Sequence, residues 1–134
     1  GIVGLGKAAE LAAVHMEDEN TRVAALRDRL EKGLLQRIPN SFVTGNPAER
    51  LPNTSNIAFE YVEGEGILLL MNREGVAASS GSACTSGSLE PSHVLRAMKV
   101  PYTAAHGAIR WSGCKNCAPC SRVVRAHLGN ASCR

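Results

Sequence analysis

One cysteine, Cys84, stands in a run of small polar residues whose composition favours an accessible thiol. Between Ser79 and Ser88, no side chain is larger than that of Thr85. Such a run has little apolar surface to bury, so packing cannot offset the entropy cost of ordering it, and we expect a mobile loop. A thiol acts as a nucleophile in its thiolate form, and a mobile loop lets it move between two places. The composition therefore predicts a reactive Cys84, with an ordinary surface cysteine in a linker as the alternative.

The Cys84 loop is expected to connect a strand to a helix, a kind of connection that often displays reactive groups. A short buried strand is predicted at residues 76–77, directly after Gly75. A helix is predicted after the loop, with Pro91 in its first turn. Its expected N-cap is Ser88 or Glu90, and its expected apolar face comprises Val94, Leu95 and Met98.

Spacing excludes two other classes of chemistry at this loop. Cysteine phosphatases and rhodanese-type loops place the cysteine at the start of a short anion cradle, which phosphatases close with a nearby arginine. The first arginine after Cys84 is Arg96, beyond Pro91 and inside the predicted helix. A phosphate-binding P-loop needs Gly-Lys-Ser/Thr after its glycines, and the sequence has none.

A second group of cysteines lies near the end of the chain, in CKNCAPC. Cys114, Cys117 and Cys120 have the spacing that begins a bacterial ferredoxin motif, but Val124 occupies the position of its fourth cysteine. A zinc or cluster site with Cys133 as fourth ligand is one interpretation. Unselected cysteines in a tail of altered reading frame, or of a truncated gene, are the other. We assign no metal site and keep these four cysteines as candidates only.

Short strands separated by helices are expected to position these residues. A long helix, or two joined, is predicted from Leu5 to Arg37, with a break at 16–21 and an apolar stripe of Val23, Leu26, Leu30 and Leu34. A second helix is predicted at 63–73, and strands at 41–44, 56–62 and 108–111. This order favours an α+β fold, with a small sheet covered by helices on one face.

Composition limits the class of protein. The chain has 134 residues, 44% of them hydrophobic, which suits one domain. Five cysteines are too few and too clustered for a secreted disulfide framework, so we expect a reducing compartment and a cytoplasmic location. No long apolar run predicts a membrane span, and the sparse aromatic residues, 4%, argue against nucleic-acid binding. Because the sequence starts at Gly1 and not at methionine, we expect it to begin inside a longer polypeptide.

Charge is unevenly distributed along the chain. Up to Glu90 there are eight Lys or Arg and twelve Asp or Glu residues, a formal charge of −4. After Glu90 there are seven Lys or Arg residues and no acidic one, a formal charge of +7. A basic end can serve an acidic partner, but no basic amphipathic stripe with interleaved aromatics accompanies it.

The segment SSGSACTSGSLEPSHVLRAM, followed by PYTAAHGAIRWS, closely resembles the active-site segment of the NifS-like cysteine desulfurases. These are pyridoxal-phosphate enzymes that move sulfur from free cysteine onto an enzyme cysteine. The resemblance extends upstream through LPNTSNIAFEYVEGEGILLLMNREG and GIVGLGKAAELA, and so covers Gly1 to Ser112. SHVLRAMKVPYTAAHG resembles the nitrogen-fixation branch of these enzymes more than the housekeeping one.

The resemblance implies a fold and a domain division. Residues 1–112 look like the small C-terminal domain of an aspartate-aminotransferase-type (fold type I) enzyme, whose large cofactor domain is missing from this sequence. Residues 113–134 depart from the family pattern and form an atypical, basic, cysteine-containing tail.

The resemblance also implies roles for individual residues. Cys84 matches the cysteine that takes the substrate sulfur as a persulfide, and Arg110, in AIRWS, matches the arginine that binds the substrate carboxylate. His106 is expected to make a structural hydrogen bond, while His15 and His93 receive no function.

The lysine that binds pyridoxal phosphate in this family stands in a motif after a histidine. None of Lys7, Lys32, Lys99 and Lys115 stands in such a motif. We therefore expect no cofactor-binding residue in this chain, although the parent enzyme is expected to use pyridoxal phosphate.

The function that follows is a C-terminal fragment of a cysteine desulfurase, inactive by itself. The parent enzyme is expected to be a homodimer that takes L-cysteine as substrate and passes sulfur to a scaffold protein. That sulfur is expected to serve iron-sulfur cluster or nitrogenase cofactor assembly. The alternative is a stand-alone sulfur-relay or metal-binding module that works without pyridoxal phosphate.

Overall fold

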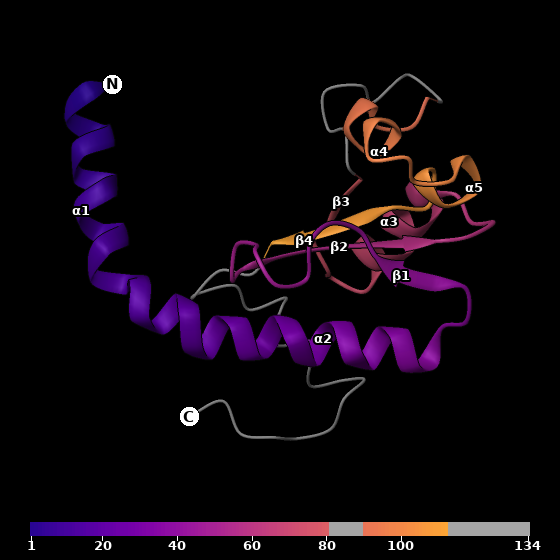
Figure 1. The fold of residues 1–134 in the computed structure, drawn as a ribbon, viewed down its shortest axis with the longest axis horizontal. Helices are drawn as coiled ribbons and strands as arrows, with labels where there is room; N and C mark the ends of the chain where they lie inside the picture. The colour runs from indigo at the N-terminus through magenta and orange to yellow at the C-terminus, as the bar shows by residue number, and fades with distance from the viewer. Residues whose placement is uncertain (81–89, 113–134) are drawn as a thin grey trace.

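A four-stranded antiparallel sheet forms the centre of the computed structural model, which describes residues 1–80 and 90–112. Its strands lie in the order β1-β2-β4-β3, so the last strand in sequence is inserted between the second and the third. Their bounds are Ser41–Val43 (β1), Thr54–Phe59 (β2), Ser79–Ser80 (β3) and Ile109–Ser112 (β4). The predicted α+β class is confirmed, and the sheet places segments from distant parts of the sequence side by side (Figure 1).

The long N-terminal helix is continuous but changes its geometry where the sequence turns polar. It comprises α1 (Ile2–Asp18), a π-helical turn η1 (Glu19–Val23) and α2 (Ala24–Arg37). The predicted break at 16–21 therefore overlaps a π-turn, a known way to bend a helix without interrupting it. Beyond this bend α1 extends away from the sheet (Figure 1), and none of its residues is buried.

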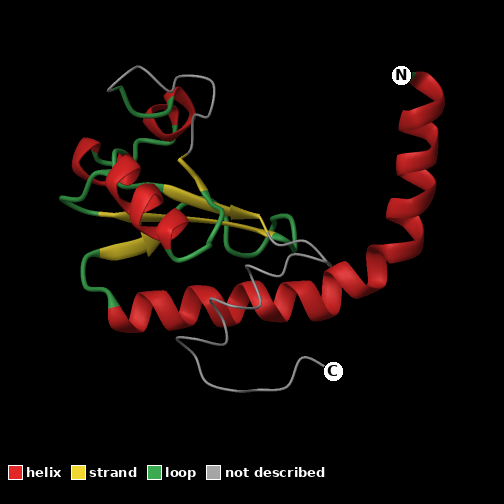
Figure 2. Cartoon of the chain, turned by 180° about the vertical axis from the view of Figure 1, so that it is seen from behind, coloured by secondary structure: helices red, strands yellow, loops and turns green. Residues whose placement is uncertain are grey.

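Two helices pack on the first face of the sheet. They are α2 and α3 (Gly64–Arg73), and α2 runs along this side of the sheet in both views (Figure 1 and Figure 2). Ile57 and Ile109, fully buried, form the middle of this core, and the rings of Phe59 and Trp111 meet edge to face at 6.1 Å. The partly buried side chains packed against them are Leu30, Leu34, Val43, Ile67, Leu68, Met71 and Ala78.

Two short helices, α4 (His93–Ala97) and α5 (Tyr102–Ala105), cover one end of the opposite face (Figure 1). Their core contains Ala58, Leu95 and Ala108, with further contacts from Ala104, Ala105, Phe42 and Val100. Helices on only one face were expected, and this expectation is wrong. It failed because Ala58 and Ala108 are too small to look like a core, yet they let two helices approach this face closely.

The elements around the Cys84 loop differ in detail from the expected ones. The preceding strand is β3, at 79–80, and not residues 76–77, which lie in the connection after α3. The following helix begins after Pro91, because Ser92 is its N-cap and accepts a hydrogen bond from the backbone N–H of Val94 at 3.3 Å. Of its expected apolar face, Leu95 is buried, whereas Val94 and Met98 are exposed.

Gly64, at the start of α3, and Gly107, just before β4, permit close backbone contacts. A Cβ atom on Gly107 would lie 2.1 Å from the carbonyl oxygen of Phe59, and one on Gly64 would lie 2.7 Å from that of His106. The backbone N–H of Gly64 donates to the same His106 carbonyl oxygen at 3.0 Å. His106 thus takes a structural role through its backbone, while its ring contacts Tyr102. These contacts fix where β4 begins, and so where Arg110 lies.

Candidate functional site

A row of polar side chains crosses the sheet on the face that α4 and α5 cover at one end only. Arg110 on β4 lies directly opposite Asn56 on β2 and Ser79 on β3. Thr44 continues the row past β1, with its backbone N–H donating to the Asn56 carbonyl oxygen at 2.9 Å. We call Thr44, Asn56, Arg110 and Ser79 the polar row. Because side chains alternate along a strand, all four share one face, opposite to the Ile57 and Ile109 core.

Arg110 has the properties of an anion-binding residue. Its neighbours Ile109 and Trp111 are buried on the other face, which holds the strand rigid while the Arg110 side chain is exposed. Among the described residues, its guanidinium group has no hydrogen bond and no ion pair. A guanidinium group offers parallel N–H donors that match the two oxygens of a carboxylate. The geometry therefore suits Arg110 to the carboxylate-binding role expected for it.

Cys84 itself lies outside the described residues, but the chain that carries it leaves the sheet beside Arg110. Ser80, the last residue of β3, is paired with Ile109, the residue before Arg110. Pairing of β3 with β4 thus places Ser80, the last described residue before the Cys84 segment, next to the strand that carries Arg110.

The tail cysteines Cys114, Cys117, Cys120 and Cys133 also lie outside the described residues, so the metal site considered for them stays untested. Within residues 1–80 and 90–112, no three His, Cys, Asp or Glu side chains are grouped to hold a metal ion. No helix in the same part of the chain is both long and apolar enough to cross a membrane.

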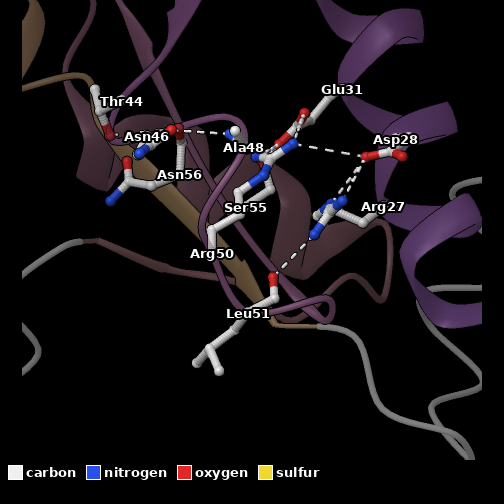
Figure 3. A network of polar contacts seen from close by, with 10 residues as sticks. All are labelled: Arg27, Asp28, Glu31, Thr44, Asn46, Ala48, Arg50, Leu51, Ser55 and Asn56. Carbon is white, nitrogen blue, oxygen red and sulfur yellow. Dashed lines mark hydrogen bonds and ion pairs between the residues drawn. The ribbon is translucent and has the colours of Figure 1, made fainter. Parts of the chain in front are cut away.

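A buried ion pair, which the sequence reasoning missed, holds the opposite face together (Figure 3). Glu31 on α2 is only 7% exposed and forms a bidentate ion pair with Arg50. In this pair, Nη2 of Arg50 donates to Oε2 of Glu31 at 2.7 Å. The hydroxyl of Ser55 on β2 donates to Oε1 of the same carboxylate at 2.6 Å. Nearby, Arg27 donates to the carbonyl oxygen of Leu51 at 2.9 Å. These contacts tie α2 to β2 and to the connection that precedes it.

The electrostatics of this pair favour its charged form. Burial acts to raise the pKa of Glu31, but hydrogen bonds from Arg50 and Ser55 and the positive charges of Arg50 and Arg27 hold that pKa below its usual value. Hydrogen bonding to Glu31 in turn raises the pKa of Arg50. The pair is therefore a structural clamp. Its only signal in the sequence was charged residues within the amphipathic pattern of α2, which usually indicates a solvated face.

Asn56 is another residue that the sequence did not mark as functional. It begins the segment NIAFEYV, which was read only as an alternating strand. Its side-chain oxygen Oδ1 is buried and has no hydrogen-bond partner among the described residues. Register decides its neighbours, because Asn56 meets Arg110 only when β2 pairs with β4.

The lysines of the described residues lie outside the polar row. They are Lys7 on α1, Lys32 on α2 and Lys99 between α4 and α5, and all three are exposed. Lys7 forms an ion pair with Glu10 at 2.8 Å, and none of the three belongs to the polar row. A cofactor lysine outside this chain remains a prediction.

Comparison with known proteins places this small α+β domain in a family of enzymes. The aminotransferase class-V family model matches residues 1–129. A cysteine desulfurase of Gluconacetobacter diazotrophicus is 76% identical over 112 residues, covering 84% of this chain and 28% of that protein. The cysteine desulfurase NifS of Azotobacter vinelandii is 70% identical over 111 residues, covering 83% and 28%. A crystal structure of a NifS-like protein from Rickettsia africae superimposes with a TM-score of 0.74 at 27% identity, covering 93% of this chain and 32% of that one.

The chain belongs to the aminotransferase class-V family. Within that family it is similar to the NifS-type cysteine desulfurases, which confirms the resemblance found in the Cys84 and Arg110 segments. The likeness to solved NifS-like proteins also confirms the expected fold type I small domain. The chain spans little more than a quarter of the length of these curated relatives.

Proposed function

We propose that this chain is the C-terminal part of a cysteine desulfurase, in which Cys84 receives sulfur from L-cysteine and Arg110 holds the substrate carboxylate. The observation that carries the proposal is the pairing of β3 with β4. It brings the start of the Cys84 loop next to an exposed strand arginine without a partner in the described part of the chain. The similarity to cysteine desulfurases supports the choice of substrate.

The proposed reaction divides its work between the two residues. The guanidinium group of Arg110 binds and orients the carboxylate of L-cysteine through parallel hydrogen bonds. The thiolate of Cys84 attacks the substrate sulfur, a sulfur–sulfur bond forms, and the carbon–sulfur bond of the substrate breaks. The electron pair of the broken bond stays on carbon, which takes up a proton to give alanine. In these relatives' family, pyridoxal phosphate supplies the electron sink, and residues outside the described part of this chain would hold it.

Other features of the proposal concern the whole enzyme. The persulfide on Cys84 passes its sulfur to an acceptor scaffold protein, for iron-sulfur cluster or nitrogenase cofactor assembly. The enzyme is a cytoplasmic homodimer, and this chain alone is inactive because it lacks the cofactor lysine. The scarcity and clustering of its cysteines support a reducing compartment.

A chimera tests the roles of Cys84 and Arg110. Residues 1–112 replace the matching segment of Azotobacter vinelandii NifS, and sulfide release from L-cysteine is measured in the presence of a thiol reductant. We expect activity in the chimera, loss of sulfide release in Cys84→Ser with substrate binding retained, and a KM raised ~10- to 100-fold in Arg110→Ala. The two phenotypes differ because one variant removes the nucleophile and the other removes a contact to the carboxylate.

Controls separate loss of function from loss of folding. Arg73→Ala changes an exposed arginine on α3 and should leave KM unchanged. Circular dichroism of every variant should match that of the parent chimera. A folded, cofactor-loaded chimera that releases no sulfide would refute the proposed function, and normal turnover in Cys84→Ser would refute the role of that cysteine.

A further inference from the structure

A buried acceptor without a partner lies opposite an exposed arginine in the polar row. The Oδ1 atom of Asn56 is buried without a hydrogen-bond partner, and the guanidinium group of Arg110 has none among the described residues. A buried polar atom without a partner costs stability, and such atoms in native structures usually have a function or a missing partner. Asn56 and Arg110 are directly opposite in the β2–β4 register, where side chains on one face lie within contact distance.

We propose that Asn56 is a positioning residue for Arg110. When a carboxylate binds, Oδ1 of Asn56 accepts one N–H bond from the guanidinium group and so orients the group. This inference rests on the proposed function for the identity of the carboxylate, that of an α-amino acid. It adds a second residue to the carboxylate subsite.

The number of donors on arginine makes this arrangement possible. A guanidinium group carries five N–H donors, and a bidentate carboxylate uses two of them. One of the remaining three satisfies Oδ1 of Asn56. Because this hydrogen bond forms together with the bound carboxylate, it adds to the affinity for the carboxylate.

The other members of the polar row have partners of their own, which leaves Asn56 to act on Arg110. The hydroxyl of Ser79 donates to the carbonyl oxygen of Ser80 at 2.8 Å. The hydroxyl of Thr44 lies 3.4 Å from the carbonyl oxygen of Asn56, to which it donates. An amide at position 56 also adds no charge beside the guanidinium group, so it orients the cation without neutralising it. An aspartate there would compete with the substrate carboxylate.

Acetate is a suitable probe because it presents a carboxylate without requiring the cofactor. The 134-residue chain, labelled with nitrogen-15, is titrated with acetate while the Nε–H resonance of Arg110 and the side-chain amide of Asn56 are followed by NMR. We expect both resonances to shift along one saturable curve, and methylammonium chloride at equal ionic strength to produce no such curve. The Asn56→Ala variant should weaken acetate binding about fivefold to tenfold, the usual contribution of one hydrogen bond.

Two further variants keep the test decisive. Asn56→Asp preserves an acceptor but neutralises Arg110, so acetate binding should weaken more than in Asn56→Ala. Asn72→Ala, on the exposed surface of α3, should bind acetate as the parent chain does. Each variant must retain the backbone amide spectrum of a folded chain, and a variant that unfolds is replaced by Asn56→Ser, which should show the same weakening as Asn56→Ala.

Equal acetate affinity in the parent chain and in folded Asn56→Ala or Asn56→Ser would overturn the inference, as would shifts of Arg110 without shifts of Asn56. The chimera separates this failure from failure of the proposed function. If the chimera releases sulfide and Asn56→Ala leaves its KM unchanged, the desulfurase activity is supported and the positioning role of Asn56 is refuted. If Asn56→Ala raises KM with little change in kcat, and raises the inhibition constant of alanine but not that of ethylamine, the positioning role is supported.

Discussion

Glu31 and Arg50 show how a single pair of residues can hold two distant segments together. The Glu31 carboxylate receives hydrogen bonds from Arg50 and Ser55, and it is buried between α2 and β2. Desolvation of the two charges costs free energy, which the bidentate geometry and the Ser55 hydroxyl offset. Asp28, whose Oδ1 lies 3.6 Å from Nη2 of Arg50, adds a second, more exposed acidic partner.

The lowered pKa of Glu31 predicts how stability depends on pH. A carboxylate whose pKa is lower in the folded than in the unfolded chain stabilises the fold fully above the unfolded value. This stabilisation is lost as pH falls from about 4.3 through the lowered folded value. We expect the free energy of unfolding, measured by urea denaturation, to decrease over this range in the parent chain and to decrease less in Glu31→Gln.

At neutral pH, Glu31→Gln should lower the free energy of unfolding by about 1–3 kcal/mol, because Arg50 loses the negative charge of its bidentate partner and keeps only the longer contact to Asp28. The control is Glu65→Gln, an exposed residue in the first turn of α3. An identical pH profile for the parent chain and Glu31→Gln would show that Glu31 is not the titrating group.

At the scale of the elements, backbone contacts between turns decide where the strands that carry the site begin. Gly107 lies against the carbonyl oxygens of Phe59 and Val62, and its own backbone N–H donates to the Ala104 carbonyl oxygen at 3.1 Å. Any side chain at position 107 would push β4 away from β2. The register that places Arg110 opposite Asn56 therefore depends on a glycine three residues earlier.

Two glycine-to-alanine substitutions, which are expected to change the stability of the chain in opposite directions, test this dependence. Gly107→Ala should destabilise the chain by more than ~2 kcal/mol, because the new Cβ atom meets backbone that cannot rotate away. Gly66→Ala, inside α3 with nothing within 4 Å of a new Cβ atom, should stabilise it by about 1 kcal/mol. Thermal melts followed by circular dichroism report both. Equal melting temperatures for the two variants would contradict the close contact at Gly107.

At the scale of the whole molecule, the charged and polar groups of the candidate site are distributed over elements that meet only in the folded sheet. The exposed lysines of the described residues lie on α1, on α2 and after α4, and none of them belongs to the polar row. The apolar side chains Ile2, Val3 and Leu5 on α1 are also 73–90% exposed, so this helix contributes no core to the domain.

The lysine positions predict how the purified 134-residue chain responds to pyridoxal phosphate. No lysine of the described residues belongs to the polar row that contains Arg110, so we expect no saturable visible absorbance band at one cofactor per chain. The measurement is a spectrophotometric titration followed by borohydride reduction and peptide mapping, with full-length Azotobacter vinelandii NifS as positive control. Stoichiometric labelling of one lysine in this chain would contradict the prediction that the cofactor lysine lies outside it.

The sequence by itself predicted the long N-terminal helix, α3, α4 and the approximate strands β1, β2 and β4, but not α5. It also singled out Cys84 and Arg110, whose roles stay predictions. Local patterns are enough for these features, because helical periodicity, turn residues and the sequence motifs around Cys84 and Arg110 can all be recognised within short windows. The same windows misplaced β3 by three residues and the N-cap of α4 by two or four, since the ends of elements depend on contacts that a short window does not contain.

Only the tertiary structure decided which residues are neighbours across the sheet. The β2–β4 register pairs positions 54 residues apart, Asn56 with Arg110, and the Glu31–Arg50 pair joins a helix to a loop. A one-residue slip in the pairing of β2 with β4 would move every side chain of the slipped strand to the opposite face. The packing of Ile57 and Ile109 into one core selects the observed register, because the alternative would bury Asn56 and Arg110 and expose the two isoleucines.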